Sequence, residues 1–387
     1  MAIHNKKKKF VLGVAHAFIE LLCLPQRIFS KKVNLKEFNP RKILLLRLDH
    51  IGDIVMTSPA FSVLRERFPT SEIILLTGSA GKQLYSKDPH IDRVLEFNWP
   101  WSHRPDERGF SISKLKELWQ LVIQLRKEQV DVLVDFRGDL RFVVLFGLLS
   151  GIKIRISNSR SGQSSLLHAY SNYEVDRHEV ERSLDVIKCL APVISGVRTR
   201  VFLEQDEVYA IKQLLEKAIG MPFPEKLALI APYSSKDVKS WPDGHFKEVI
   251  AYLRKRNFTV IVVGAPENAE HAGNLIEGFS EHVFSMAGKT NIRELAALTS
   301  VSTLLVGVDT GVLHIASGFD VPVLAIFGST RSVEFRPYSP FARVIESNTC
   351  QCNQFLHIKC DYPEGNYAKC LQDVSPAAVI NALEETI

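Results

Sequence analysis

An alternation of short apolar runs with amphipathic stretches constrains the fold of this chain more than any other feature. Four such runs follow one another from Lys42 onward: KILLLRL, EIILLT, RVLEF and DVLVDF. Strands that are buried on both faces of a parallel sheet have continuous apolar sequences, and the stretches between them have the pattern of crossover helices. The first half of the chain is therefore predicted to form a parallel sheet with helices on both faces.

The alternation stops in a polar region at about residues 193–225 and starts again with LALIA, FTVIVVG, TLLVGV and VPVLAIF. A chain of 387 residues is long enough for two domains of ordinary size. We therefore predict an α/β protein with two Rossmann-like, doubly wound domains. The expected division is a basic extension at residues 1–38, a first domain at 39–200, a linker region at 201–225, a second domain at 226–348, and a cysteine-rich segment with a closing helix at 349–387.

Helices are expected at residues 54–68, 113–128, 206–219, 244–255 and 311–318, and the closing helix is expected to begin at Ser375.

The N-terminal extension combines a basic cluster at residues 6–9 with an apolar run at residues 10–24. This run is shorter than the ~20 residues that a helix needs to span a bilayer, and His16 and Glu20 interrupt it, which also disfavours a cleaved secretory signal. As a helix it would suit an anchor at the surface of an anionic membrane, and packing on the protein itself is the alternative. Much of the net charge of +5 lies in this extension, so no nucleic-acid partner is predicted.

Ligands of doubly wound sheets bind beyond the carboxyl ends of the strands, so the loops at these ends are the candidate sites. The first such loop, after KILLLRL, reads Asp49-His50-Ile51-Gly52-Asp53. Gly52 permits a tight turn, and Asp53 is expected at a helix N-terminus, where the helix dipole and free amides keep a carboxylate ionised. A plain helix cap is the alternative for Asp53. The loop lacks the G-x-G-x-x-G pattern of dinucleotide dehydrogenases.

The loop after LALIA contains Ser234, Ser235 and Lys239. Hydroxyl donors and a positive charge at a strand end have the chemistry that a diphosphate needs. The alternative is a solvated turn whose lysine has no binding role.

The sharpest local signal is the turn Asp309-Thr310-Gly311, which follows the buried run TLLVGV and leads directly into a helix. Backbone amides at the helix start, the Thr310 hydroxyl and the close approach permitted by Gly311 predict an anion site that needs no metal. A purely structural turn is the alternative. His314 lies about one turn into this helix, where a core histidine is the usual explanation and a contact with a phosphate or sugar is the other.

A fourth loop follows FTVIVVG and carries Glu267, Asn268 and Glu270. Carboxylates at this place could bind the hydroxyl groups of a ribose. They could equally cap the next helix.

Four motifs in a fixed order resemble those of glycosyltransferase family 9, the heptosyltransferase family: RLDHIGDIVMTSPAFSVLRERFP, KSWP, GVDTGVLHIASG and FGST. The resemblance covers roughly residues 42–387. It implies a GT-B architecture, in which an N-terminal acceptor domain and a C-terminal nucleotide-sugar domain face each other across a cleft. It also implies transfer of heptose from ADP-heptose to an anionic, lipid-linked lipopolysaccharide core acceptor, by a cytoplasmic enzyme peripheral to the inner membrane. Another nucleotide sugar in O-antigen or capsule assembly, or a non-catalytic nucleotide-sugar-binding partner, is the alternative.

The resemblance also assigns roles by position. Asp53 corresponds to the catalytic base, which takes the proton of the acceptor hydroxyl. Lys239 and the turn at residues 309–311 would hold the diphosphate and stabilise charge on the leaving group. The implied reaction is a single displacement with inversion that uses neither metal nor cofactor. The family's ribose-contacting glutamate has no unambiguous counterpart, because Glu267 and Glu270 both fit and Asn268 could occupy the place.

The acceptor side carries a weaker signal. Arg137, Asp139 and Arg141 follow DVLVDF, and Arg47 directly precedes the loop of Asp53. These arginines would suit an anionic acceptor sugar, and ordinary surface arginines are the alternative.

Four of the six cysteines cluster near the C-terminus, at Cys350, Cys352, Cys360 and Cys370. Four thiols suggest a structural zinc ion, but the spacing is not that of a standard zinc ribbon. A structural loop beneath the closing helix is therefore the favoured interpretation. The remaining cysteines, Cys23 and Cys189, are expected to be buried or to face lipid.

Overall fold

The computed structural model describes residues 34–98, 112–162, 166–193, 196–279, 281–347, 360 and 368–386. Its N-terminal domain is built on a six-stranded sheet with the order β3-β2-β1-β4-β5-β6, and all neighbouring strands are parallel. The strands are β1 (Lys42–Arg47), β2 (Glu72–Thr77), β3 (Arg93–Glu96), β4 (Val132–Asp135), β5 (Ile154–Asn158) and β6 (Ala169–Ser171).

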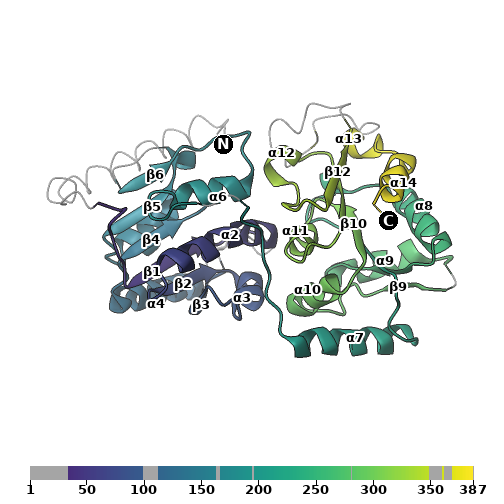
Figure 1. The fold of residues 1–387 in the computed structure, drawn as a ribbon, viewed down its shortest axis with the longest axis horizontal. Coiled ribbons are helices and arrows are strands. Elements are labelled where there is room, and N and C mark those ends of the chain that lie inside the picture. Colours follow the sequence, from purple (N-terminus) through teal and green to yellow (C-terminus); the bar gives the residue numbers. More distant parts are fainter. Residues whose placement is uncertain are drawn as a thin grey trace.

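The C-terminal domain repeats this arrangement with the order β12-β11-β10-β7-β8-β9, and its strand pairs are again parallel. Its strands are β7 (Leu227–Ala231), β8 (Thr259–Val262), β9 (Val283–Ser285), β10 (Leu304–Val308), β11 (Val323–Phe327) and β12 (Ala342–Glu346). In each sheet the first strand in sequence lies between the second and the fourth, which is the Rossmann order. The predicted pair of doubly wound domains is confirmed (Figure 1).

Helices cover both faces of the N-terminal sheet. On one face α2 (Ile51–Arg67) and α6 (Glu179–Ile187) pack on residues such as Ile43 and Leu45. On the other face α4 (Ile112–Glu128), together with α5 (Leu140–Phe142) and the π-helical turn η2 (Val143–Leu148), packs on Leu44 and Leu46. A short helix, α3 (Ser79–Tyr85), follows β2. Successive residues of β1 thus alternate between two buried faces, which explains its continuous apolar sequence.

The C-terminal sheet is also covered on both faces. The first group contains α8 (Asp243–Lys255), α9 (Ala269–Ile276) and α14 (Pro376–Glu384), and the second contains α7 (Gln205–Ile219), α10 (Ile292–Ser300) and α11 (Gly311–Ser317). Two short helices, α12 (Ser332–Phe335) and α13 (Lys369–Gln372), complete the domain. The predicted closing helix is confirmed as α14, whose start is capped by the Ser375 hydroxyl, which accepts a hydrogen bond from the Ala378 amide at 3.2 Å.

The segment expected to be a linker contains α7, whose buried side chains Ile211, Leu215 and Ile219 belong to the core of the C-terminal domain. Four strands of the sheets, β5, β6, β9 and β12, were not predicted. β6 and β12 lie at sheet edges and are only partly buried, so they lack a continuous apolar run.

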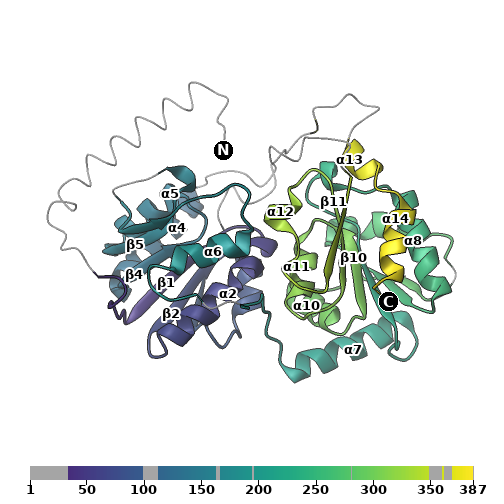
Figure 2. The same ribbon diagram turned by 45° about the horizontal axis from the view of Figure 1, so that its top comes forward.

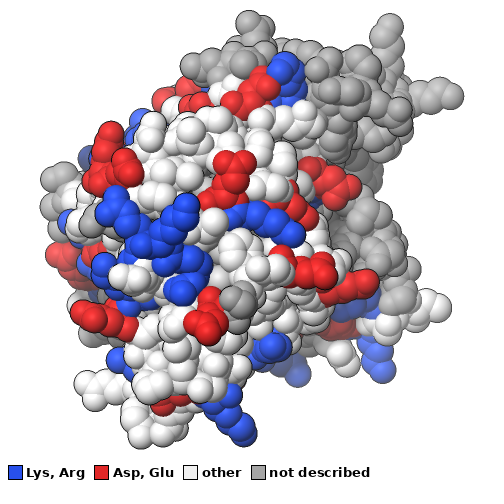
Figure 3. Space-filling model, turned by 90° about the vertical axis from the view of Figure 1, so that its right-hand side faces the viewer, with Lys and Arg blue, Asp and Glu red and all other residues white. Residues whose placement is uncertain are grey.

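Among the described residues, no helix is both long enough and apolar enough to cross a membrane. The basic N-terminal segment that we predicted as a membrane anchor lies outside the described residues. Figure 3 shows the end of the molecule formed by the C-terminal domain, where a group of Lys and Arg side chains is bordered by Asp and Glu. The described part of this face therefore carries charges of both signs.

Candidate active site

The strand order of both sheets reverses beside the first strand, between β1 and β4 and between β7 and β10. At such a switch point the loops leave in opposite directions and open a crevice at the carboxyl ends of the strands. Asp53 follows β1, Lys239 follows β7, and the turn at residues 309–311 follows β10. The topology therefore places the main predicted site residues at the two switch points.

The two domains meet where α2 packs against α11 (Figure 2). A Cβ atom added to Gly52 would lie 2.6 Å from Cδ2 of His314, and one added to Gly311 would lie 3.1 Å from Cβ of Ile51. Glycine at these two positions thus allows the starts of the two helices to approach closely. Asp53 follows Gly52 directly, so the interdomain contact brings it close to the start of α11.

Asp53 occupies the third position of α2, and its side chain is 21% exposed. One carboxylate oxygen, Oδ2, accepts a hydrogen bond from the His50 amide at 3.2 Å, and the other, Oδ1, lies 3.3 Å from Nη2 of Arg47. Burial raises the pKa of Asp53, but the positive charge of Arg47 and the contacts with His50 outweigh it, so the pKa lies below its ordinary value. The carboxylate is therefore ionised at neutral pH, as predicted.

Arg47, which contacts Asp53, is only 2% exposed. Its guanidinium lies 3.1 Å from Asp49 and 2.7 Å from Glu179, and it donates a hydrogen bond to the Phe136 carbonyl at 3.0 Å. With three carboxylates around it, this arginine is engaged inside the protein. The suggestion that Arg47 contacts an anionic acceptor is therefore wrong, since its charge is used to hold carboxylates of its own domain.

The loops after β7, β10 and β11 converge on one carboxylate oxygen. Oδ2 of Asp309 accepts hydrogen bonds from Nζ of Lys239 at 2.6 Å and from the Thr330 hydroxyl at 2.6 Å. Burial raises the pKa of Asp309, and the ammonium of Lys239 and these hydrogen bonds lower it to below its ordinary value. Two of the loops predicted to form a diphosphate site therefore lie together. Thr330 was not predicted as a site residue, although its FGST motif was noticed.

Thr310 is the cap residue of α11, and its hydroxyl makes no capping hydrogen bond. Together with Gly311 it forms the turn in which the helix begins. The Lys239 side chain, 19% exposed, is held beside this turn by Asp309. The positive charge of Lys239 and the Thr310 hydroxyl thus both lie close to the carboxyl end of β10.

His314 is buried in the contact between the domains, at 4% exposure. Its Nδ1 atom has no hydrogen-bond partner within the described part of the chain. Burial lowers the pKa of His314 below its ordinary value, and the nearby charges of Asp309 and Asp53 only partly oppose this effect. A histidine that is neutral at pH 7 therefore lies near both carboxylates. Its contact with a phosphate or sugar stays a prediction.

The remaining donor-side residues are less closely gathered. Asn268 is a structural cap, because its side-chain oxygen accepts a hydrogen bond from the Ala265 amide at 3.1 Å. Glu267 and Glu270 are both exposed, the first in the turn η5 (Pro266–Asn268) and the second at the start of α9. Either glutamate could still contact a ribose. The two serines of the β7 loop differ in exposure: Ser234 is half-buried, and Ser235 is exposed.

On the acceptor side, Arg137 and Arg141 flank Asp139 at the end of β4, and Nη2 of Arg141 lies 2.6 Å from its carboxylate. Arg137 also pairs with Asp49. Burial and the neighbouring charge of Arg160 lower the pKa of Arg137 to about 10. Arg160 follows β5, which pairs with β4, and sequence reasoning missed it because its strand was not predicted. Three arginines therefore surround this strand end.

The cysteine cluster is only partly described. Cys360 is half-buried and Cys370 is buried. Cys350 and Cys352 lie outside the described residues, as does Cys23, so the zinc hypothesis stays untested. Cys189 is half-buried, and burial raises its pKa to about 11.

Two Rossmann-like domains that meet at their switch points form a GT-B architecture. A family model described as glycosyltransferase family 9 (heptosyltransferase) matches residues 118–365, and the chain belongs to this family. The chain is 25% identical over 297 residues to lipopolysaccharide heptosyltransferase 3 of Escherichia coli K12, an alignment that covers 74% of this chain and 83% of that protein.

Solved structures confirm the GT-B fold. A glycosyl transferase family 9 protein of Veillonella parvula superimposes with a TM-score of 0.75 at 21% identity, over 92% of this chain and 99% of that chain. The E. coli heptosyltransferase WaaC, solved with ADP-2-deoxy-2-fluoro heptose, superimposes with a TM-score of 0.66 at 21% identity, over 89% of this chain and all of that chain.

Proposed function

We propose that this protein is an inverting glycosyltransferase that transfers heptose from ADP-heptose to an anionic, lipid-linked lipopolysaccharide core acceptor. The observation that carries the proposal is the position of Asp53, ionised and partly exposed, beside the start of α11 and near the turn that holds Lys239. A heptosyltransferase of this family binds a fluorinated ADP-heptose, and an E. coli relative is a lipopolysaccharide heptosyltransferase. Both support this donor and this acceptor class.

In this mechanism the acceptor hydroxyl oxygen attacks the anomeric carbon from the side opposite the diphosphate. The bond between the anomeric carbon and the diphosphate oxygen breaks, ADP leaves with the electron pair, and the hydroxyl proton passes to Asp53. A carboxylate with a low pKa accepts this proton late, when bond formation has made the hydroxyl acidic. Arg47 keeps Asp53 charged until that moment.

The charge that develops on the leaving diphosphate needs positive groups and hydrogen-bond donors. Lys239 keeps N–H groups beyond the one given to Asp309, since an ammonium has three donors. The Thr310 hydroxyl and the amide of Gly311 lie beside it, and Ser234 and Ser235 supply further donors from the same end of the sheet. We propose that these groups hold the diphosphate without a metal ion, so activity should persist in excess EDTA.

The acceptor is assigned to the first domain, at residues 39–200, and the donor to the second, at residues 226–348. The arginines at the end of β4 support an anionic acceptor, because guanidinium groups bind carboxylate and phosphate through paired hydrogen bonds. A lipid-linked acceptor and a nucleotide-sugar donor meet at the cytoplasmic face of the inner membrane. We therefore propose a peripheral location there.

A second candidate keeps the chemistry and changes the donor. Glu267 and Glu270 both follow β8 and are exposed, so either could contact the ribose, and the preference for ADP-heptose over another nucleotide sugar does not follow from one defined contact. Thermal unfolding with a panel of nucleotide sugars distinguishes the two, since a ligand that binds the folded state raises the unfolding temperature with its concentration.

The central test is ADP release by the full chain with ADP-heptose and a heptose-deficient lipopolysaccharide core. Asp53→Ala should reduce turnover by at least about a hundredfold, the usual contribution of general base catalysis, and leave ADP affinity nearly unchanged. The matched control is Asp206→Ala, which removes an exposed aspartate of α7 and should retain parental turnover. Parental turnover in Asp53→Ala would eliminate Asp53 as the base. Failure of the parent protein to release ADP with this pair would instead reject the donor or the acceptor.

A further inference from the structure

Helix α4 exposes a stripe of large apolar side chains. Ile112 is 88% exposed, Leu115 50%, Trp119 58% and Ile123 40%. Their spacing of three or four residues places all four on one side of the helix. We name these four residues the α4 stripe.

The stripe is separate from the face of α4 that forms the core. Leu118, Leu121, Val122 and Leu125 are buried and pack on the N-terminal sheet. At about 100° per residue, the centre of this buried face lies about a third of a turn away from the centre of the stripe. The helix therefore presents a second apolar face, which contributes nothing to the core described above. A contiguous exposed apolar surface of this kind marks an interaction site more often than chance exposure does.

Cations border the stripe. Lys116, Arg126 and Lys127 are exposed. On the helical wheel Lys116 and Lys127 lie on one flank of the stripe, and Arg126 continues the line of the stripe beyond Ile123. The acidic residues of α4 lie elsewhere: Glu117 pairs with Lys114 at 3.2 Å, and Glu128 pairs with Lys42 at the base of β1. The stripe and its flanks are thus apolar and basic, with no acidic residue of α4 among them.

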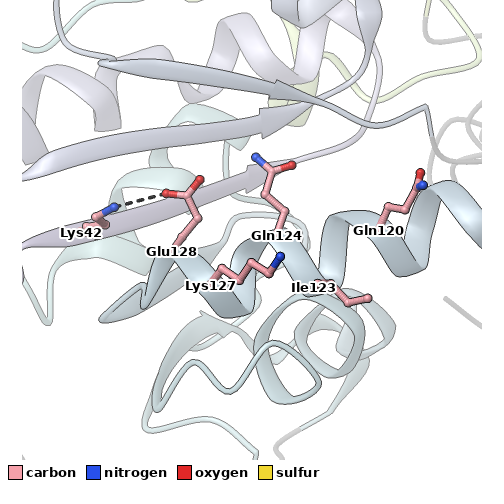
Figure 4. Close-up of a pocket in the computed structure, with 6 residues that line it drawn as sticks. All are labelled: Lys42, Gln120, Ile123, Gln124, Lys127 and Glu128. Carbon is pink, nitrogen blue, oxygen red and sulfur yellow. Dashed lines mark hydrogen bonds and ion pairs between the residues drawn. The ribbon is translucent and has the colours of Figure 1, made fainter.

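A shallow hollow of about 380 Å³ adjoins the C-terminal end of the stripe. Figure 4 shows Gln120 and Gln124 on the same helix as Ile123 and Lys127, with the ion pair of Lys42 and Glu128 closing one end of the hollow. Amide groups and an ammonium here can donate hydrogen bonds to a phosphate-containing headgroup.

We propose that the α4 stripe is the surface by which the acceptor domain docks on an anionic lipid bilayer. The proposal rests on the proposed function, because an enzyme with a lipid-linked acceptor must work at a membrane surface. Trp and aliphatic side chains flanked by Lys and Arg are the composition of helices that lie in the membrane interface. Charge complementarity selects a bilayer with anionic lipids, whose surface potential attracts each basic group.

The position of α4 agrees with this partner. The helix covers the face of the N-terminal sheet opposite α2, and α2 contacts the C-terminal domain through α11. A bilayer bound to the stripe would therefore lie on the far side of the acceptor domain's sheet from that contact, and leave the helix starts that carry Asp53 and Gly311 uncovered.

The test is co-sedimentation of the full chain with vesicles of phosphatidylethanolamine and phosphatidylglycerol, compared with vesicles of phosphatidylcholine alone. All proteins, the parent included, carry Lys6→Gln, Lys7→Gln, Lys8→Gln and Lys9→Gln, to weaken attraction by the basic N-terminus. We expect Leu115→Gln with Trp119→Gln to weaken binding to the anionic vesicles by roughly tenfold or more, and Lys116→Gln with Lys127→Gln by a similar factor that shrinks in high salt. The matched control, Tyr209→Gln, removes an exposed aromatic residue of α7 and should bind like the parent.

Three results would overturn the proposal. Stripe variants that bind anionic vesicles like the parent would show that the stripe does not dock. A lower unfolding temperature of these variants without vesicles, with unchanged vesicle binding, would show that the stripe packs against another part of the chain. Loss of self-association by the stripe variants, again with unchanged vesicle binding, would show a contact between copies. Turnover with a delipidated, soluble acceptor should be the same in the stripe variants and the parent. If no protein, the parent included, shows turnover with this acceptor, the proposed function is rejected, and the vesicle binding results on docking still stand.

Discussion

The strongest energetic prediction concerns a buried ion pair that joins the two domains. Nη2 of Arg182, on α6, donates a hydrogen bond to Oε2 of Glu334, on α12, at 2.5 Å, and their side chains are 2% and 0% exposed. Nη1 of Arg182 also lies 3.0 Å from Glu179, and Glu334 lies 3.3 Å from Arg331. Removing one partner of such a pair leaves a buried charge without its main counterion.

We predict that Glu334→Leu lowers the free energy of unfolding by about 3 kcal/mol, the low end of the range for breaking a buried pair, because Arg182 keeps Glu179. Arg182→Met with Glu334→Leu removes both charges and should recover at least about 1.5 kcal/mol relative to the sum of the single changes. The matched control is Glu385→Leu, which removes the partner of exposed Arg343 and should change stability by less than about 1 kcal/mol.

Urea unfolding measures these free energies, with the slope of each transition compared among variants. If Glu334→Leu changes stability no more than Glu385→Leu does, the pair does not stabilise the domain contact. If the double substitution is as damaging as the sum of the two single changes, the two side chains are not coupled, and the reasoning from burial is refuted.

Three further predictions follow from the contact region. Gly52→Ala should lower stability by about 1–3 kcal/mol and reduce turnover, because its methyl group would meet the ring of His314 at 2.6 Å; an unchanged unfolding temperature would contradict this. Because Nδ1 of His178 accepts from Val180, its Nε2 carries the hydrogen and donates to the Arg336 carbonyl at 2.8 Å, and burial lowers the pKa of His178 to about 4. Between about pH 4 and the ordinary pKa of ~6.5, the unfolded state therefore binds more protons than the folded state. The stabilisation from neutral, buried His178 is complete above this pH range and is lost as the pH falls through it. Unfolding at several pH values should show this pH dependence in the parent and its loss in His178→Gln. Since the pKa of Asp53 lies below its ordinary value, kcat/KM should not fall from pH 7 to about 5 through protonation of this group, and an acid limb near pH 6 that Asp53→Glu shifts would contradict that expectation.

The fold was predictable because its strongest signals are local. β1 and β10 are central strands with both faces buried, and their apolar sequences stand out without knowledge of their partners. β12 has side chains that are mostly half-exposed, so its sequence carries no comparable signal. α7 was predicted as a helix at residues 206–219, but its place in the C-terminal domain was not, because only one narrow face of it packs on the sheet, through Ile211, Leu215 and Ile219.

The candidate site was predictable to the same degree. Asp53 and the turn at residues 309–311 lie directly after strong strands, so their position at the switch points followed from the alternation. Arg182 and Glu334 are far apart in the sequence, and each resembles an ordinary surface charge until the two domains are brought together. Thr330 could not be predicted for the same reason, since its partner Asp309 lies on another loop.

The single oxygen of Asp309 that binds both Lys239 and Thr330 has a consequence for redesign. It ties the loops after β7, β10 and β11 into one unit. Exchanging the loop after β10 for that of a relative with a different donor would remove the carboxylate that both other loops bind, and exchanging either of the others would remove one of its two hydrogen-bond donors. A chimaera with a new sugar preference should therefore require all three segments to be transplanted together.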